Sequence, residues 1–193
     1  MCIRDSSRSG WTGEKGFELY SDGDNFSGEE LWDYLLEAGK EEKLIASDIA
    51  SMHIRRIEAG ILDYGTDFDQ RFNPFDLGLQ KFIDFDKSDF IGKEALKNIR
   101  DKGITKQFIG FKISGKNIGY NLRRMPIIDK ENIAKGFISS CIYSPTFGCN
   151  IGLGFVDIDT ISSTEVFKAT VNDEVRDVEI VALPFSSRLE KMK

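Results

Sequence analysis

Apolar and polar residues change their spacing several times along the first hundred positions. Residues 17–20, FELY, alternate between apolar and polar side chains, which predicts a strand. Helical spacing comes next, and we expect helices at about 27–38, 48–59 and 92–100. Ser27 is a suitable N-cap for the first of them. The first half of the chain therefore predicts one strand and three amphipathic helices.

Two features set the rest of the chain apart from these helices. The segment 61–79, ILDYGTDFDQRFNPFDLGL, has turn residues but also many aromatic ones, so we expect a packed loop that often lies against a ligand. After Gly103 the chain consists of short β-rich runs separated by turn signals, which predicts a small antiparallel barrel or sandwich. The fold class is thus α+β. The β-rich runs are QFIGFKI, MPII, KGFISSCIYS, IGLGFVDI, EVFKATV and RDVEIVAL.

Composition narrows the classes of protein that this chain can represent. Its 193 residues, 40% hydrophobic and 30% charged, are typical of a globular protein with one domain, or one small domain and part of another. The net charge of -6 argues against nucleic acid and acidic membranes as partners. No run of about 18 apolar residues is present, and no signal peptide is visible. Three cysteines without framework spacing predict a cytoplasmic protein.

The first residues need separate treatment. Residues 1–6, MCIRDS, have no periodicity linked to the residues after them and resemble a translated adapter, so we expect a non-native leader. An ordinary N-terminus is the alternative. Residues 9–20, SGWTGEKGFELY, then predict a hairpin with a glycine turn, a Trp-containing arm and an alternating arm. With a single histidine and no CxxC, we expect no metal site.

Four motifs occur in an order that is more specific than any one of them. Together they resemble the glycine cleavage T-protein superfamily, the tetrahydrofolate-dependent aminomethyltransferases and demethylases. The resemblance covers nearly the whole chain after residue 6. The motifs are GWTGEKGFELY, RRIEAGILDYGTD, DFIGKEAL and GFISSCIYSPTFGCNIGLGFVD.

The resemblance implies an N-terminally truncated fragment. Family members have a folate-binding region of α+β subdomains followed by a β-barrel. We therefore expect residues 7–103 to be the last part of the folate-binding region and residues 104–193 to be the complete barrel. The family's catalytic aspartate would lie upstream, so no catalytic residue is assigned. We expect the chain alone to be inactive.

The resemblance also implies tetrahydrofolate as cofactor and a small one-carbon donor as substrate. Glu18 stands where the family uses a glutamate to accept hydrogen bonds from the pterin edge; otherwise it is a solvent-facing strand residue. Trp11 either stacks on the ring or fills the core. Arg56 and Glu58 form either a buried structural pair, a surface pair or a support for the loop with Tyr64. The candidate cofactor-binding residues are Glu18, Trp11, Tyr64 and Arg56.

Departures from the family pattern favour its demethylase branch, which includes dimethylsulfoniopropionate demethylase. Met52 stands where T-proteins usually have a folate-contacting arginine, and no tyrosine follows Pro184-Phe185. The stretch NPFDLGLQKFIDFD, residues 73–86, lacks the Thr/Ser-Pro-Leu of T-proteins and is more like the demethylase branch. A true glycine cleavage aminomethyltransferase, with H-protein as its partner, is the alternative. A non-catalytic folate-binding protein of iron–sulfur cluster maturation is a second one, although its KGCYxGQ motif is absent near Asn73. A barrel module without ligand is a third.

The remaining chemistry-bearing residues favour structural roles. His53 lies on a predicted helix, where a proton carrier and a partly buried structural histidine are both conceivable, and the second is more common. Cys141 and Cys149 fall in predicted barrel strands, where we expect buried thiols.

Overall fold

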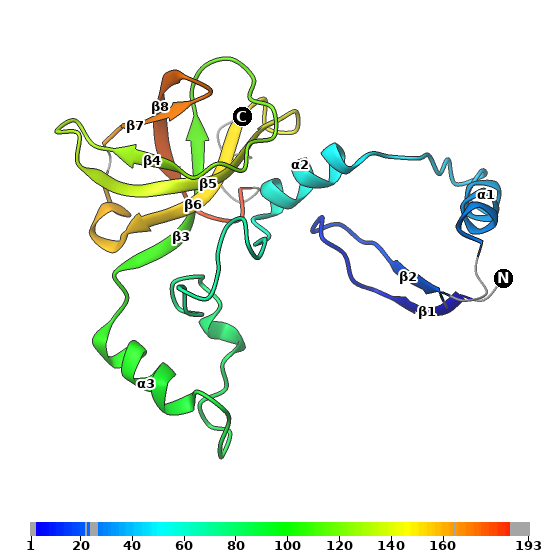
Figure 1. Ribbon diagram of the computed structural model, residues 1–193, viewed down its shortest axis with the longest axis horizontal. Helices are drawn as coiled ribbons and strands as arrows, with labels where there is room; N and C mark the ends of the chain where they lie inside the picture. The colour runs from blue at the N-terminus through cyan, green and yellow to red at the C-terminus, as the bar shows by residue number, and fades with distance from the viewer. Residues whose placement is uncertain (1–2, 22, 24–26, 164, 186–193) are drawn as a thin grey trace. The chain divides into compact units, whose positions relative to one another are not determined.

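The computed structural model describes residues 3–21, 23, 27–163 and 165–185 (Figure 1). The chain divides into two compact units, residues 1–56 and 57–193, and each is described by itself. The second unit contains the barrel and also segment 57–103. The boundary predicted between residues 103 and 104 stays a prediction.

The first unit contains a two-stranded sheet and helical elements. Strand β1, Ile3–Ser7, pairs antiparallel with β2, Glu18–Ser21, so that Ser7 lies opposite Glu18. The strand predicted around Glu18 is confirmed, but the arm that carries Trp11 is a loop and not a strand. Residues 3–6 belong to β1, and their non-native origin stays a prediction.

Helix α1, Gly28–Ala38, has the predicted ends. The Ser27 side chain accepts a hydrogen bond from the N–H of Glu30 at 3.2 Å, which satisfies one of the free donors at the helix start. Gly39 comes directly after the helix, and a Cβ there would lie 2.5 Å from Leu44 Cβ, so the next turn can close only on a glycine. The second predicted helix is also confirmed, as α2, Ile49–Ala59, which begins in the first unit and ends in the second.

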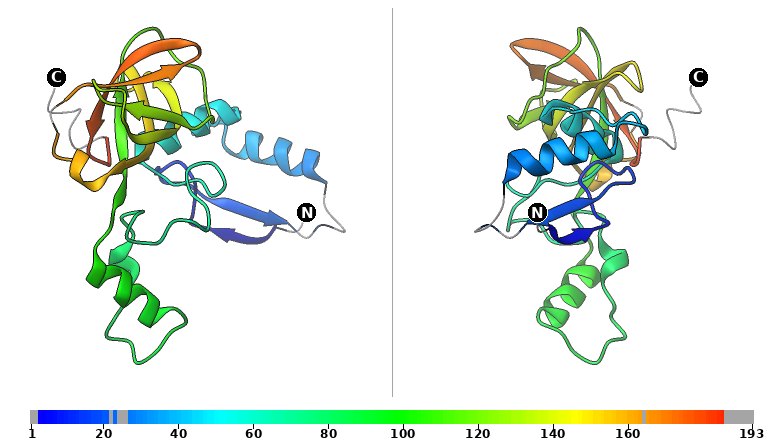
Figure 2. Two further views of the ribbon diagram at one scale, coloured as in Figure 1. Left: turned by 60° about the vertical axis from the view of Figure 1, so that its left-hand side comes forward. Right: turned by 90° about the vertical axis from the view of Figure 1, so that its right-hand side faces the viewer.

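The second unit is built around a closed six-stranded antiparallel barrel (Figure 2). This confirms the predicted α+β fold class and shows that the strands form a barrel and not a sandwich. Around the barrel the order is β3-β6-β5-β4-β7-β8, and every neighbouring pair is antiparallel. The strands are β3 Lys106–Ile113, β4 Met125–Ile128, β5 Ala134–Ser144, β6 Cys149–Asp157, β7 Phe167–Val171 and β8 Glu174–Val181.

Alternation along the strands fills the barrel interior. In β7, Phe167, Ala169 and Val171 are buried, whereas the side chains between them are exposed. Asn172 and Asp173 both have positive φ and join β7 to β8, as a two-residue hairpin turn requires. The interior cluster draws on all six strands, so the barrel has a continuous core of its own.

The aromatic segment before the barrel packs onto it, as predicted. Phe72 stacks on Phe155 of β6 with ring centroids 4.2 Å apart, and Phe108 meets the same ring edge-on at 5.3 Å. A short 3₁₀ turn, Gln80–Phe82, and helix α3, Lys93–Lys102, come after this segment. A second short turn, Ile158–Thr160, comes after β6.

Candidate functional site

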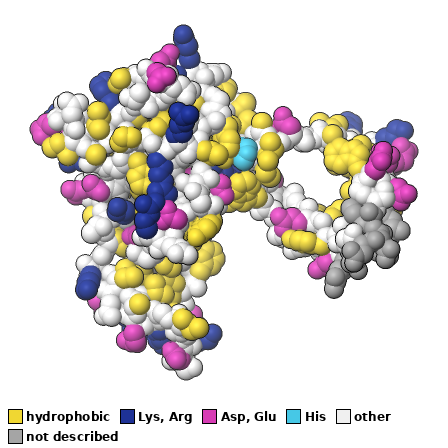
Figure 3. All heavy atoms as spheres, in the orientation of Figure 1, with side chains coloured by type: hydrophobic (Ala, Val, Ile, Leu, Met, Phe, Trp, Pro, Cys, Tyr) yellow, Lys and Arg dark blue, Asp and Glu magenta, His cyan; other side chains and the backbone are white. Residues whose placement is uncertain are grey.

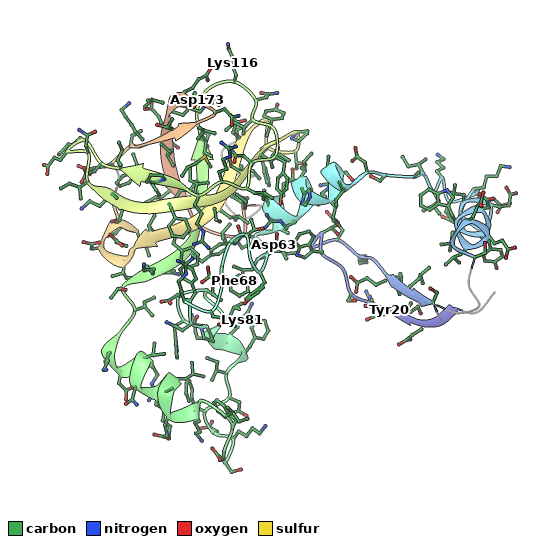
Figure 4. All side chains as sticks on the ribbon, viewed as in Figure 1. Tyr20, Asp63, Phe68, Lys81, Lys116 and Asp173 are labelled. Carbon is green, nitrogen blue, oxygen red and sulfur yellow. The ribbon has the colours of Figure 1, made fainter. Side chains whose placement is uncertain are left out.

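Glu18 lies at the first position of β2 with its side chain exposed. Its Oε2 atom accepts hydrogen bonds from the Ser9 hydroxyl and from the Tyr20 hydroxyl, the latter at 3.1 Å. The hydrogen bond to the Glu18 carboxylate, and its charge, raise the pKa of Tyr20 (labelled on β2 in Figure 4). Within the described residues, Oε1 accepts no hydrogen bond, so the carboxylate is oriented by its own hairpin and keeps one oxygen for another donor.

Trp11 lies half-buried in the loop between β1 and β2, and it meets two residues of α2. The Arg56 guanidinium lies 5.2 Å from the centre of the Trp11 ring. The His53 ring approaches the same ring edge-on at 5.9 Å. His53 is only partly exposed, which fits the predicted structural role. The loop and the helix therefore share an aromatic contact with a fixed positive charge beside it.

Arg56 is fully buried, and so is nearly all of Glu58. The surface-pair alternative is therefore wrong for these residues, because neither side chain is solvated. The structure brings Trp11 and Arg56 together, and Glu18 belongs to the same unit. Tyr64 belongs to the second unit. The assignment of these four residues to a cofactor site stays a prediction.

Tyr64 projects from the loop after α2 and is 63% exposed. Its ring meets Phe68 edge-on at 5.4 Å, and the N–H of Gly65 donates to the Phe68 carbonyl at 2.8 Å. Gly65 has a φ of 90°, in the left-handed region that favours glycine. Figure 4 labels Asp63 and Phe68 in this loop. A tight turn thus presents an aromatic side chain to solvent.

Asp67 anchors this turn to the barrel, and the sequence did not reveal how. Its fully buried carboxylate accepts hydrogen bonds from the hydroxyls of Ser139 at 2.6 Å and Ser140 at 2.8 Å. The N–H of Asp63 donates to its other oxygen at 3.0 Å. Neighbouring strand residues normally face opposite ways, but an irregularity in pairing between Ile138 and Ser140 lets both hydroxyls reach one carboxylate.

The start of the same segment is held by a second buried acid. Glu58 accepts a hydrogen bond from the hydroxyl of Ser144, the last residue of β5. One barrel strand therefore binds both Glu58 and Asp67, on either side of Tyr64. The sequence signal that could have revealed these two contacts is the three serines in the otherwise apolar run GFISSCIYS, because buried hydroxyls need hydrogen-bond partners.

Two absences in the described part of the chain bear on the kind of site. No group of three or more His, Cys, Asp or Glu side chains among the described residues could hold a metal ion. Among the same residues, none of the helices is long and apolar enough to cross a membrane.

Comparison with known families identifies the class of protein. Residues 5–87 match the GCVT N-terminal domain, and residues 106–186 match the glycine cleavage T-protein C-terminal barrel domain. The two matches occur in the family's order and together cover most of the chain. The chain belongs to the glycine cleavage T-protein family.

Relatives in this family carry the name aminomethyltransferase. One from Halothermothrix orenii is 36% identical over 182 residues, which is 93% of this chain and 49% of the relative. One from Oceanobacillus iheyensis is also 36% identical, and the match covers 94% of this chain and 48% of that relative. The chain thus spans about half the length of the curated relatives it matches.

A solved structure has the same fold. The crystal structure of glycine cleavage system aminomethyltransferase T from Bartonella henselae matches with a TM-score of 0.80 and 22% sequence identity. The match covers 93% of this chain and 49% of that chain.

Proposed function

We propose that this chain is part of an enzyme that transfers a one-carbon unit to tetrahydrofolate in the cytoplasm. The observation that carries the proposal is the oriented Glu18 carboxylate on β2, in the unit where Arg56 is fixed against Trp11. Family membership supports the reaction class. Residues upstream in the longer relatives would supply the rest of the site, including its catalytic group.

The side chains present fit a folate. A pterin offers neighbouring N–H donors along one edge, and a carboxylate accepts two such donors side by side. Glu18 offers Oε1, which accepts no hydrogen bond within the described residues, to the first donor, and the second donor would replace the Ser9 or the Tyr20 hydroxyl on Oε2. Trp11 offers a ring for stacking, and Arg56 supports that ring. When bound, tetrahydrofolate supplies the nitrogen that accepts the carbon, and the protein contributes mainly positioning and exclusion of water.

The loop with Tyr64, in the second unit, is a separate candidate for contact with a ligand. Tyr64 is exposed, yet the turn beneath it is fixed by buried hydrogen bonds between Asp67 and the barrel. A solvent-facing aromatic side chain on an anchored turn loses little conformational entropy when it contacts a ligand. Tyr64 is thus suited to pack against a flat or apolar part of the folate or donor.

The donor defines two candidate functions. The names of the relatives support an aminomethylated carrier, with H-protein as partner. Met52 at the position of the usual arginine favours the second candidate, demethylation of a small methylated compound. A methionine removes a charge and five hydrogen-bond donors, so folate must be held differently. Supplying each donor to the complete protein and identifying the folate product, methylene or methyl, distinguishes the two.

The central test is Glu18→Gln in a complete protein that includes the upstream region. Gln keeps the size and one acceptor but presents a donor to the second pterin N–H. Losing a charged hydrogen-bond partner costs about 1.5–3 kcal/mol, so folate affinity should fall about 10- to 150-fold. Calorimetric titration with a folate measures this loss.

A matched variant and a thermal melt keep the test specific. Asp33→Asn changes an exposed acid of α1 in the same unit and should leave folate affinity unchanged. Glu18→Gln should leave the melting temperature nearly unchanged, because an exposed strand residue adds little to the core. Unchanged affinity for Glu18→Gln would remove Glu18 from the site, and a large fall in melting temperature would make its role structural.

A further inference from the structure

A cavity of about 350 Å³ lies in the second unit, away from Glu58 and Asp67. Its walls come from the loop at residues 71–76, from α3 and the residues after it, from the start of β3, from the residue before β4 and from β5. Three positively charged residues line it, namely Arg71, Lys106 and Arg124. Figure 3 shows Lys and Arg side chains gathered over the barrel near β3 and β6. In an acidic protein, such a grouping indicates a specific use.

Arg124 is held in place from two sides. Its guanidinium carbon lies 5.1 Å from the centre of the Phe137 ring and 5.9 Å from that of Phe72. Its Nη2 atom donates to Asp69 Oδ2 at 3.2 Å. The rings restrict the guanidinium plane and reduce its contact with water, which strengthens its interaction with an anion. Arg124 is thus oriented before any ligand arrives.

The acids near the cavity already have donors. Asp69 binds Arg71 through both oxygens, at 2.8 and 2.6 Å, and these hydrogen bonds hold the pKa of Asp69 well below its usual range. Asp76 accepts hydrogen bonds from the backbone N–H and the side-chain amide of Asn73, at 3.1 and 2.6 Å.

Positive charge therefore remains in excess. Three cations face the two acids Asp69 and Asp76, and Lys106 forms no ion pair within the described residues. Only one of Arg124's five N–H donors is used in the described structure, since Asp69 takes a single hydrogen bond from it. Lys106 of β3 and the unused N–H donors of Arg124, which directly precedes β4, thus meet at one hollow.

We propose that this cavity binds a small molecule through a doubly charged oxyanion group, such as a phosphate monoester or a dicarboxylate. The planar guanidinium of Arg124 would donate two parallel hydrogen bonds to the oxyanion, and the Lys106 ammonium would balance its second charge. The volume is within the range of small-molecule sites. This site is independent of the proposed folate site, since none of its residues belongs to that site.

The test titrates the full chain with inorganic phosphate and, separately, with succinate, by calorimetry at low salt. We expect saturable millimolar binding of at least one anion, and its identity distinguishes the phosphate source from the dicarboxylate source. Arg124→Gln and Lys106→Gln should each weaken that binding about tenfold, the effect of losing one charged partner. Added sodium chloride should weaken it only gradually, by screening.

Arg123→Gln is the matched control, because Arg123 is adjacent in sequence, exposed, and not part of the cavity wall. It should leave binding unchanged. If Arg124→Gln lowers the melting temperature, Lys106→Gln still decides, since the cation–π contacts described with Phe72 and Phe137 are those of Arg124. The proposal is overturned if neither anion binds, if Arg123→Gln weakens binding as much as Lys106→Gln, or if chloride competes as well as the dianion.

Discussion

The barrel and the first unit differ in how their apolar side chains are used. The barrel buries a continuous cluster that includes Phe111, Ile127 and Val171, each with no exposed surface. Among the described residues of 1–56, Leu31 is the one buried apolar side chain. By contrast, Phe17 is 70% exposed and Ile45 is 81% exposed.

This difference shows where the stability of the chain originates. Each buried apolar Å² contributes about 25 cal/mol, so the barrel carries most of the hydrophobic stabilisation. The first unit depends on local devices, such as the Ser27 cap and the hydrogen bonds around Glu18. Short helices with few tertiary contacts are marginal in water. Exposed apolar side chains such as Ile45 make the first unit suited to packing against another surface.

The strongest test of this contrast separates the regions. A fragment of residues 104–193 should unfold in one cooperative step, because its core cluster lies entirely within the barrel. A fragment of residues 1–56, the whole first unit, should lack a cooperative transition. Urea titration followed by circular dichroism measures both. A barrel fragment without a transition, or without protected amides in hydrogen exchange, would contradict the proposed boundary.

A core substitution should show the same contrast within the whole chain. Phe111→Ala removes a fully buried ring from β3 and should lower the free energy of unfolding by about 3–5 kcal/mol. Phe17→Ala removes a mostly exposed ring and should change it by less than about 0.5 kcal/mol. Chemical denaturation of both variants compares the two regions. Equal losses would mean that the first unit contributes as much to the core as the barrel does.

Asp67→Asn should have a smaller effect, centred on the loop. The amide keeps one acceptor, but the hydroxyls of Ser139 and Ser140 lose a charged partner in a buried place. We expect a loss of about 1.5–3 kcal/mol. Hydrogen exchange should speed up at residues 63–68 more than in β7. Asp63→Asn, at the other end of the turn, serves as control. Uniform loosening of the barrel would show that Asp67 supports the core and not the loop.

The sequence predicted most of the fold because local signals and tertiary packing agree. Alternation in FKATV and the turn residues Asn172 and Asp173 specify a hairpin, and this hairpin is found. Ser27 likewise predicted the start of α1. The strand pattern alone left barrel and sandwich open, because closure depends on pairing between β3 and β8, which are distant in the chain, and the barrel was implied only by the family resemblance.

The candidate site was less accessible to sequence reasoning. The Trp11 arm was predicted to pair with β2, but pairing is made by Ile3–Ser7, most of which was expected to be a non-native leader. The contact between Asp67 and both serines was missed, because an irregular pairing in β5 lets adjacent residues face one partner. The cavity at Arg124 was missed for a related reason. Its charged residues lie far apart in sequence and meet only when the barrel closes.

A pH titration sharpens the comparison for the barrel alone. Asp129, between β4 and β5, accepts hydrogen bonds from the N–H groups of Ile133 and Glu131, which lower its pKa below the ordinary 3.8, with Lys135 contributing. Because the folded pKa is depressed, this carboxylate stabilises the barrel above about pH 4, and the effect is lost as pH falls through the lowered pKa.

Asp129→Asn should therefore cost stability at pH 7 and progressively less as the pH falls below 4. Denaturant midpoints of the variant and the parent chain, measured between pH 7 and pH 2, give the difference. Glu179→Gln, at an exposed acid on β8, is the control and should show little pH-dependent difference. A constant difference for Asp129→Asn at every pH would mean that its charge does not stabilise the turn.

The smallest expected effect is a difference in thiol reactivity, which reports how often each region opens. Cys141 has no exposed surface, and burial raises the pKa of its thiol to about 12, so reaction with a disulfide reagent requires the barrel to open. Cys149 is only partly buried and should react faster.

Leu31→Cys places a thiol at the buried apolar position of α1 in the first unit. In a background with Cys2→Ser and Cys149→Ser, this thiol should react well before Cys141, because few contacts hold α1 closed. Labelling rates measured by mass spectrometry separate the two regions. If both thiols react at one common rate, the barrel and the first unit open together, and the contrast in stability between them is wrong.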